Sequence, residues 1–501
     1  MAKDSLVELA GEALRQRITA CAPHILSADP DPDATTMALL HDLAARVRAD
    51  RALDLCWLLM TCVAGAMPTR DQLLECFRQL ELAEAGTEHF VLLRATAGLA
   101  SANGNIARPV TIVEGAVVVD VDFTARHGHN TGIQRVVRET LARWSTEQEL
   151  ALVAWTEDGI MTRSLVTAER ARVLEWTSDR IHEHSTLADE DAAGLVVPWN
   201  CTVVLPEVAQ ARIWESLSCL GEFSPNRLVA VGYDAIPVTS AEYVIPTETD
   251  RFVRYLSVIK HVDVVAGISE SSSEEFAGFF DALEAQGLQS GRVVTVRLPV
   301  ALASRVASEV LEPRVDEVPL VVCVGTQEPR KNQLAVLAAA EALWQEGLAF
   351  ELLFIGSAAM PLSVPFDIEL ERLQKLGRRV SVKRQGSDAF LEAAYRDARF
   401  SVFVSLHEGY GLPVGESLAV GTPVVVTRYG SIAEIARDGG CLLVDPRDDA
   451  AIAAGMRTLL LDDEVHAQLA RAAASRPPRT WDDYAGELWS VVADVAAGAS
   501  R

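Results

Sequence analysis

The chain has 501 residues, a formal net charge of −25 at pH 7 and a hydrophobic share of 49%. This length exceeds what one hydrophobic core supports, so we expect two to four domains, and the hydrophobic share excludes global disorder. The excess of acidic residues argues against a nucleic-acid partner and a polybasic membrane anchor, because both depend on clustered Lys and Arg.

Residues 1–5 lead into an amphipathic helix that carries acidic residues, which is not the pattern of a secretory signal. The longest apolar run, residues 55–67, is too short to span a bilayer. The eight cysteines are scattered without a C-x-x-C pair, as is typical of reduced thiols. We therefore predict a cytoplasmic location and leave open a peripheral attachment to the inner face of the membrane.

Residues 1–105 are expected to form an all-helical module. Apolar residues recur at helical spacing, as in Leu53, Trp57 and Met60, and Thr69 with Gln72 gives the pattern of a capping box. No constellation in this segment carries chemistry. We interpret it as an accessory module that offers a surface to a protein partner.

After residue 105 strands alternate with helices, which predicts parallel α/β sheets. Residues 106–312 are expected to form one Rossmann-like domain, with residues 157–200 leaving room for an insertion. A polar, proline-marked break at residues 311–319 precedes a second such domain, residues 313–478. A last helix follows in residues 479–501.

Expected strands of the first domain lie at residues 117–121, 150–155, 202–205, 228–232 and 262–268. Those of the second lie at residues 320–325, 351–356, 380–383, 401–405, 424–427 and 441–444. The predicted fold class is α/β, with two facing Rossmann-like domains behind a helical module and a ligand cleft between the two.

Glu408 and Glu416 form the most informative pair of the chain. They flank a turn with two glycines, after a buried strand and around Pro413, which suits the first position of a helix. Open α/β sheets bind ligands at the carboxyl ends of strands, and a helix start offers N–H groups to an anion. The pair suits a ligand with hydroxyls beside a phosphate, such as a nucleotide sugar. The alternative is a surface Glu408 and a Glu416 that only interacts with the helix dipole.

Arg330 and Lys331 follow the first expected strand of the second domain. Arginine can bind a diphosphate in a bidentate way, and lysine can act as a point charge, so the two could stabilise a departing diphosphate. The alternative is a solvated cationic pair beside Glu328.

Gly132 lies at a strand-to-helix turn of the first domain, where its N–H could face a phosphate; an ordinary tight turn fits equally well. His127 and His129 in the same loop lack a carboxylate ligand nearby, which favours solvated side chains over a metal site. No metal is therefore predicted.

Asp234 also ends an expected strand and would point into the cleft, although it could instead cap the following turn. Further on, a helix cap in which Ser271 or Ser272 pairs with Glu274 or Glu275 explains that segment without function.

With these residues assembled, residues 110–495 resemble the retaining nucleotide-sugar glycosyltransferases of the GT-B fold. The resemblance is to the large family that includes many bacterial mannosyl- and rhamnosyltransferases. Its strongest part is Glu408, seven residues and Glu416, and residues 325–332 come next. Supporting matches lie at residues 131–135 and 234–237, and Trp481 fits a helix that crosses back to the first domain.

The resemblance implies catalytic roles for Glu408, Asp234, Arg330 and Lys331. Glu408 would bind hydroxyls of the donor sugar and orient its anomeric carbon, and the two cations would hold the diphosphate. Glu416 would bind the ribose hydroxyls. The implied donor-binding residues are Glu416, Gly132, Gly409, Tyr410, Gly411, Leu412, Gln385 and Gly386, the last two near the nucleobase.

The resemblance also implies transfer of a hexose or deoxyhexose, with mannose or rhamnose favoured, to a glycan or lipid-linked glycan in surface polysaccharide synthesis. No cofactor or essential metal takes part, and the anomeric configuration is retained. The chain departs from the pattern at Tyr233, where many relatives have histidine, and at residues 297–300. The alternatives are a silent GT-B scaffold or binding protein and an epimerase, which would need an acid/base set that we do not find.

Overall fold

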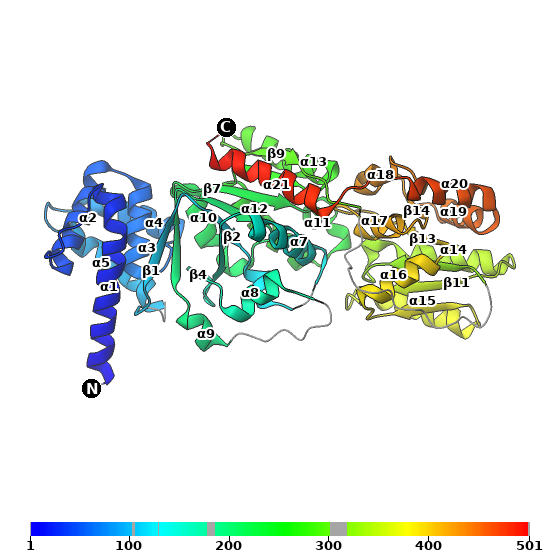
Figure 1. The fold of residues 1–501 in the computed structure, drawn as a ribbon, viewed down its shortest axis with the longest axis horizontal. Coiled ribbons are helices and arrows are strands. Elements are labelled where there is room, and N and C mark those ends of the chain that lie inside the picture. Colours follow the sequence, from blue (N-terminus) through cyan, green and yellow to red (C-terminus); the bar gives the residue numbers. More distant parts are fainter. Residues whose placement is uncertain (1, 103–105, 129, 178–185, 301–317, 499–501) are drawn as a thin grey trace.

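Five helices precede the first strand and lie at one end of an elongated molecule (Figure 1). The computed structural model describes residues 2–102, 106–128, 130–177, 186–300 and 318–498. The five helices are α1 (Ala2–Leu26), α2 (Thr36–Asp50), α3 (Leu53–Ala64), α4 (Arg70–Leu82) and α5 (Glu88–Ala102). Thr69 and Gln72 form the predicted capping box at the start of α4.

The core of these helices continues into the sheet that follows. Trp57 and Leu58 on α3 belong to the same buried cluster as Trp155 and Val197 of the sheet. The buried guanidinium of Arg17 on α1 donates to carbonyls of α3 and of the segment that enters the first strand. The boundary expected at residue 105 therefore marks a change of secondary structure, whereas the packing continues across it.

The first sheet has nine strands among the described residues, in the order β1-β5-β4-β3-β2-β6-β7-β8-β9. They are β1 (Val110–Glu114), β2 (Val117–Asp120), β3 (Leu150–Trp155), β4 (Thr162–Ser164), β5 (Leu195–Trp199), β6 (Thr202–Leu205), β7 (Arg227–Gly232), β8 (Val264–Gly267) and β9 (Arg292–Thr295). Strand β4 is antiparallel to β3 and β5, and the other pairs are parallel.

The helices of this first sheet domain are α6 (Asp122–Arg126), α7 (Gly132–Glu147), α8 (Thr167–Leu174), α9 (Leu187–Ala192), α10 (Trp214–Phe223), α11 (Ile236–Thr239), α12 (Pro246–Ile259) and α13 (Glu270–Glu284), with 3-10 turns η1 (Ala211–Ile213) and η2 (Ala241–Tyr243).

Residues 157–200, where an insertion was expected, supply two strands of the sheet, β4 and β5. Strand β4 has only three residues, and β5 contains Pro198. A short strand carries little periodicity, and proline counts against a strand assignment. Strands β1 and β9, also unpredicted, are the two edges of the sheet.

The second sheet has six parallel strands among the described residues, all six at the predicted places, in the order β12-β11-β10-β13-β14-β15. They are β10 (Leu320–Val324), β11 (Glu351–Ile355), β12 (Val380–Lys383), β13 (Phe400–Phe403), β14 (Val424–Thr427) and β15 (Cys441–Val444). Its helices are η3 (Pro329–Lys331), α14 (Gln333–Gln345), α15 (Val364–Lys375), α16 (Asp388–Asp397), α17 (Leu412–Ala419), α18 (Gly430–Ala436), α19 (Asp449–Leu461) and α20 (Asp463–Ala474).

This strand order is that of a doubly wound Rossmann sheet, in which the direction of winding reverses between β10 and β13. Ligands of such sheets bind in the crevice at this reversal, outside the carboxyl ends of the strands. The domain boundary expected at residues 312 and 313 lies outside the described residues.

The last helix, α21 (Trp481–Ala496), leaves the second sheet domain and packs on the first, as predicted (Figure 1). It lies against α7, where the indole N–H of Trp144 donates to the carbonyl of Ala485 at 2.9 Å. None of the helices in the described part of the chain is long and apolar enough to cross a membrane.

The crossing helix should carry much of the stability of the first sheet domain. Leu488 is fully buried on α21, so Leu488→Ala removes apolar contacts and leaves a cavity. We expect the free energy of unfolding to fall by roughly 2–5 kcal/mol. Leu461→Ala, at a leucine that is 65% exposed, is the control and should change it by less than about 0.5 kcal/mol. Urea titration followed by tryptophan fluorescence measures both; equal effects would contradict a structural role for α21.

Candidate functional site

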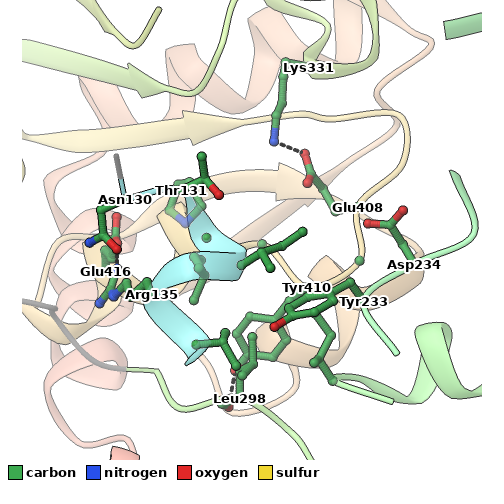
Figure 2. A pocket seen from close by; sticks show the side chains of 18 of the residues that line it. Asn130, Thr131, Arg135, Tyr233, Asp234, Leu298, Lys331, Glu408, Tyr410 and Glu416 are labelled. Carbon is green, nitrogen blue, oxygen red and sulfur yellow. Dashed lines mark hydrogen bonds and ion pairs between the residues drawn. The ribbon is translucent and has the colours of Figure 1, made fainter. Parts of the chain in front are cut away.

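A cavity of about 370 Å³ lies between the two sheet domains, where the second sheet reverses its winding. The first sheet domain contributes Asn130, Thr131, Gly132, Arg135 and Asp234 to its wall, and the second contributes Lys331, Asp388, Leu391, Glu408, Gly409, Tyr410, Gly411, Leu412 and Glu416. Figure 2 shows Glu416 beside Arg135, and Glu408 with Lys331 on the other side of the start of α7.

The Glu408 carboxylate is held by two cations. Its Oε1 lies 2.6 Å from the Lys331 ammonium, and its Oε2 lies 3.0 Å from the Arg330 guanidinium. Burial alone would favour the neutral acid, but Lys331 and then Arg330 lower the pKa of Glu408 to about 2. Glu408 is therefore ionised at neutral pH although its side chain is only 9% exposed.

Arg330 has two further partners, the carbonyl of His407 at 2.7 Å and the Glu328 carboxylate at 2.6 Å. The contact with Glu328 agrees with the alternative interpretation, in which Arg330 and Lys331 form a solvated pair beside Glu328. However, the side chains of Arg330 and Lys331 are only 15% and 13% exposed, so water does not surround them. Arg330 lies behind Glu408, and Lys331 reaches the cavity wall itself.

Glu416 lies in the first turns of α17 and is buried against the other domain. Its Oε1 accepts from the Arg135 guanidinium of α7, and the Tyr395 hydroxyl lies 3.4 Å from its Oε2. Arg135 in turn lies over the ring of Trp481, where the crossing helix begins. Arg135 is a site residue that was not predicted, although its place one turn after Gly132 puts it on the same face of α7.

The glycines of the turn allow close approach of the two domains. A Cβ at Gly409 would lie 2.4 Å from the carbonyl oxygen of Tyr233 and 2.9 Å from Asp234 Oδ2. Gly411 has φ of 108°, a conformation that side chains disfavour, and Pro413 stands in the first turn of α17 as expected. Leu412 packs against Gly132, at the start of α7.

Asp234 lines the cavity and also caps the next turn, because its Oδ1 accepts from the N–H of Ile236 at 3.2 Å. Burial raises the pKa of Asp234, with Arg330 opposing. The hydroxyl of Tyr233 donates to the carbonyl of Pro206 at 2.7 Å, so its polar atom is engaged within the first sheet domain.

Two of the predicted donor-binding residues lie outside the cavity. Gln385 and Gly386 are exposed and outside the cavity wall, which is formed instead by Asp388 and Leu391 of the next helix. Tyr410 lines the cavity, and its hydroxyl donates to the carbonyl of Leu298.

In the loop before α7, His127 stacks on Phe123, and its Nδ1 lies 2.9 Å from the carbonyl of that residue. His129 lies outside the described residues.

The cap of α13 differs from the prediction. Ser269, not Ser271 or Ser272, is the N-cap residue. The N–H groups of Glu270 and Ser271 donate to the Glu434 carboxylate of the second sheet domain. A sequence pattern cannot reveal this partner, because it comes from the other domain.

Comparison with known proteins agrees with this architecture. Residues 311–476 match the family model described as glycosyl transferases group 1. The sucrose-phosphate synthase of Thermosynechococcus elongatus has the same fold, with a TM-score of 0.51 and 16% identity over 76% of this chain and 99% of that one. The Anabaena protein HepE, solved with UDP and glucose, gives a TM-score of 0.51 and 13% identity over the same shares. The chain therefore has the GT-B fold, and its second sheet domain matches a glycosyltransferase family.

Curated relatives include the serotype-specific mannosyltransferase WbdA of Escherichia coli, 25% identical over 338 residues, which are 64% of this chain and 40% of that protein. The O-antigen chain mannosyltransferase B of Escherichia coli is 35% identical over 144 residues, 28% of this chain and 36% of that protein. The chain thus spans about two fifths of the length of these relatives.

The two sheets of this GT-B chain differ at their winding reversals. In the first sheet, the carboxyl group of Glu207 accepts from the N–H groups of Phe123 and Thr124 and from the Thr124 hydroxyl. Burial and then Asp120 raise the pKa of Glu207 to about 8. The protein's own side chain thus fills the crevice where a Rossmann sheet would bind a phosphate. The corresponding crevice of the second sheet opens into the cavity.

Gly409→Ala tests whether the turn sets the approach of the two domains. The added Cβ meets backbone atoms and Asp234, so the domains should separate. We expect a larger radius of gyration in small-angle X-ray scattering and a loss of roughly 1–3 kcal/mol in the free energy of unfolding. Gly278→Ala, in α13 with no atom within 4 Å, is the control and should gain up to about 1 kcal/mol. An unchanged radius and stability in Gly409→Ala would contradict the expected clash.

Proposed function

We propose that the chain transfers a hexose or deoxyhexose, mannose or rhamnose first, from a nucleotide sugar to a glycan or lipid-linked glycan acceptor, with retention of configuration. The fold and the family match support glycosyl transfer. Two relatives of Escherichia coli are mannosyltransferases, one of them named for an O-antigen chain, which supports mannose as the sugar and an O-antigen chain as the class of acceptor.

The observation that carries the proposal is the ionised Glu408 held by Lys331 and Arg330 at the wall of an interdomain cavity. A carboxylate can accept hydrogen bonds from sugar hydroxyls, and the two cations can accept the charge of a diphosphate. These groups follow the neighbouring strands β13 and β10, and they fit the sugar and the diphosphate on either side of the bond that a glycosyltransferase breaks.

The donor would lie along the cavity from Glu416 to Glu408. Its ribose hydroxyls would bind Glu416 and its diphosphate the start of α17, where backbone N–H groups favour an anion. The sugar would then reach Glu408 and Asp234. In this arrangement the diphosphate replaces Glu408 as the partner of Arg330 and Lys331. The Glu408 carboxylate then accepts hydrogen bonds from hydroxyl groups of the sugar.

In the proposed reaction, the bond between the anomeric carbon and the phosphate oxygen breaks while the acceptor oxygen bonds to that carbon on the same face. The acceptor hydroxyl gives its proton to an oxygen of the departing diphosphate. Arg330 and Lys331 stabilise the charge that develops on that diphosphate. No essential metal is part of this proposal, because these side chains and the helix start supply positive charge.

The contacts between the domains would keep water, a competing acceptor, away from the reacting carbon. The hydroxyls of Ser269 and Ser272 donate to the carbonyl of Gly409 at 2.6 and 2.9 Å, directly behind the turn that carries Glu408.

Donor transfer and binding test the proposal. The protein would be incubated with GDP-mannose, dTDP-rhamnose and UDP-sugars and with oligosaccharide acceptors, and the product's anomeric configuration read by NMR. We expect Glu416→Ala to weaken binding of the active donor's nucleoside diphosphate about tenfold, since the ribose loses its acceptor. Glu408→Gln should lower kcat about a hundredfold or more while binding of the nucleoside diphosphate changes little.

Glu328→Gln serves as a matched control at a carboxylate that contacts Arg330 from outside the cavity. It should keep most of the activity. Unchanged binding in Glu416→Ala, or product of inverted configuration, would contradict the proposed donor position or the proposed stereochemistry, respectively.

A further inference from the structure

A histidine next to Glu408 joins the two sheet domains. The ring of His407 has both nitrogens engaged by the first sheet domain: Nε2 lies 2.9 Å from Glu275 Oε1, and Nδ1 lies 2.7 Å from the hydroxyl of Ser240. Its carbonyl accepts from Arg330 at 2.7 Å, the same guanidinium that binds Glu408. The position of the Glu408 loop therefore depends on groups of the opposite domain.

The same Glu275 also holds the loop of Asp234. Its Oε2 accepts from the N–H of Ala235 at 2.6 Å, and its Oε1 accepts from the hydroxyl of Thr239 at 3.0 Å. One carboxylate on α13 thus contacts the residue after Asp234 and the residue before Glu408. The side chains of Glu275 and His407 are mostly buried, at 14% and 24% exposure, so water competes weakly for this contact.

We infer that Glu275 and His407 are positioning residues, which fix Glu408 and Asp234 relative to each other when the two sheet domains are in contact. The inference rests on the proposed function, since it assigns these residues to the placement of the donor sugar. Neither side chain lines the cavity, so both act through the two loops that they hold. Misplacement of a reacting group by about 1 Å is enough to slow an enzyme severely.

The contact should be sensitive to pH. The hydrogen bond to Glu275 raises the pKa of His407, with Asp234 adding to the effect and burial and Arg330 opposing it. Burial alone would raise the pKa of Glu275, but the hydrogen bonds with His407, the N–H of Ala235 and the hydroxyl of Thr239, together with the charge of His407, lower it. The ion pair is thus complete below the ordinary pKa of histidine, and it weakens as the pH rises through the raised pKa of His407.

The test compares His407→Ala, Glu275→Ala and the double variant. His407→Ala should lower kcat about tenfold, and Glu275→Ala at least as much, because it also frees the loop of Asp234. The double change should cost no more than Glu275→Ala, because both single changes break the same ion pair. The Kd for the nucleoside diphosphate of the active donor should stay within about twofold, since Glu416 is untouched. His407→Gln keeps a donor that reaches Glu275, so it should recover most of kcat and lose the fall in activity at alkaline pH.

A second measurement does not depend on activity. Without any ligand, amide hydrogen exchange of residues 405–411 should rise in each single variant and no further in the double variant. His466→Ala is the matched control, because its ring contacts only the carbonyl of Arg399 within the second sheet domain among the contacts described. It should leave both kcat and this exchange at wild-type values.

The outcomes separate the two proposals. If the wild type transfers no sugar, the proposed function fails, and exchange alone decides whether Glu275 and His407 hold the loop. If the wild type is active and the variants match it in kcat and exchange, the positioning role is wrong. Additive losses in the double variant, or an unaltered alkaline limb in His407→Gln, would overturn it as well.

Discussion

The ion pair between Glu408 and Lys331, with Arg330 behind it, is the constraint on which the site depends. A buried carboxylate is costly unless cations and hydrogen bonds compensate it. Glu408 follows β13 and the cations follow β10, and these two strands are neighbours only because the winding of the sheet reverses between them. The Rossmann order thus brings opposite charges from residues far apart in sequence to one crevice, and their mutual attraction fixes the loops that line it.

The two sheet domains contribute unequally to that crevice. In the first, the carboxyl group of Glu207 accepts hydrogen bonds from the N–H groups that a phosphate would need. This sheet domain therefore lines the cavity without offering these N–H groups to a nucleotide. Its contribution comes through contacts across the interface between the two sheet domains: Arg135 to Glu416, Glu434 to the start of α13, and Glu275 to His407. The site is therefore complete only where the domains meet. A substitution at this interface alters the site even where the substituted residue contacts no ligand.

Most of the second sheet domain could be predicted because its strands are short apolar runs and its chemistry lies at their ends. The place of Glu408, Glu416 and Lys331 at the cavity could be predicted for the same reason: each stands in a local pattern of strand, glycine turn and helix start. The partners of these residues could not be found in this way. Arg135 and Glu416 lie 281 positions apart, and no periodicity links them. Strand β4 was missed because three residues carry too little pattern.

The ion pairs also bear on how a donor would enter. Every carboxylate that we assign to a hydroxyl group is held by a cation in the structure, Glu408 by Lys331 and Arg330, and Glu416 by Arg135. A phosphate group can replace a carboxylate as the partner of these cations, so the cations need not be left unpaired, and the displaced carboxylates accept hydrogen bonds from the hydroxyl groups of the donor. A neutral sugar or a nucleoside lacks that charge, and its binding would have to break the pairs without replacing them. If the proposed function is right, a ligand that carries the diphosphate should therefore bind more tightly than a neutral sugar or a nucleoside.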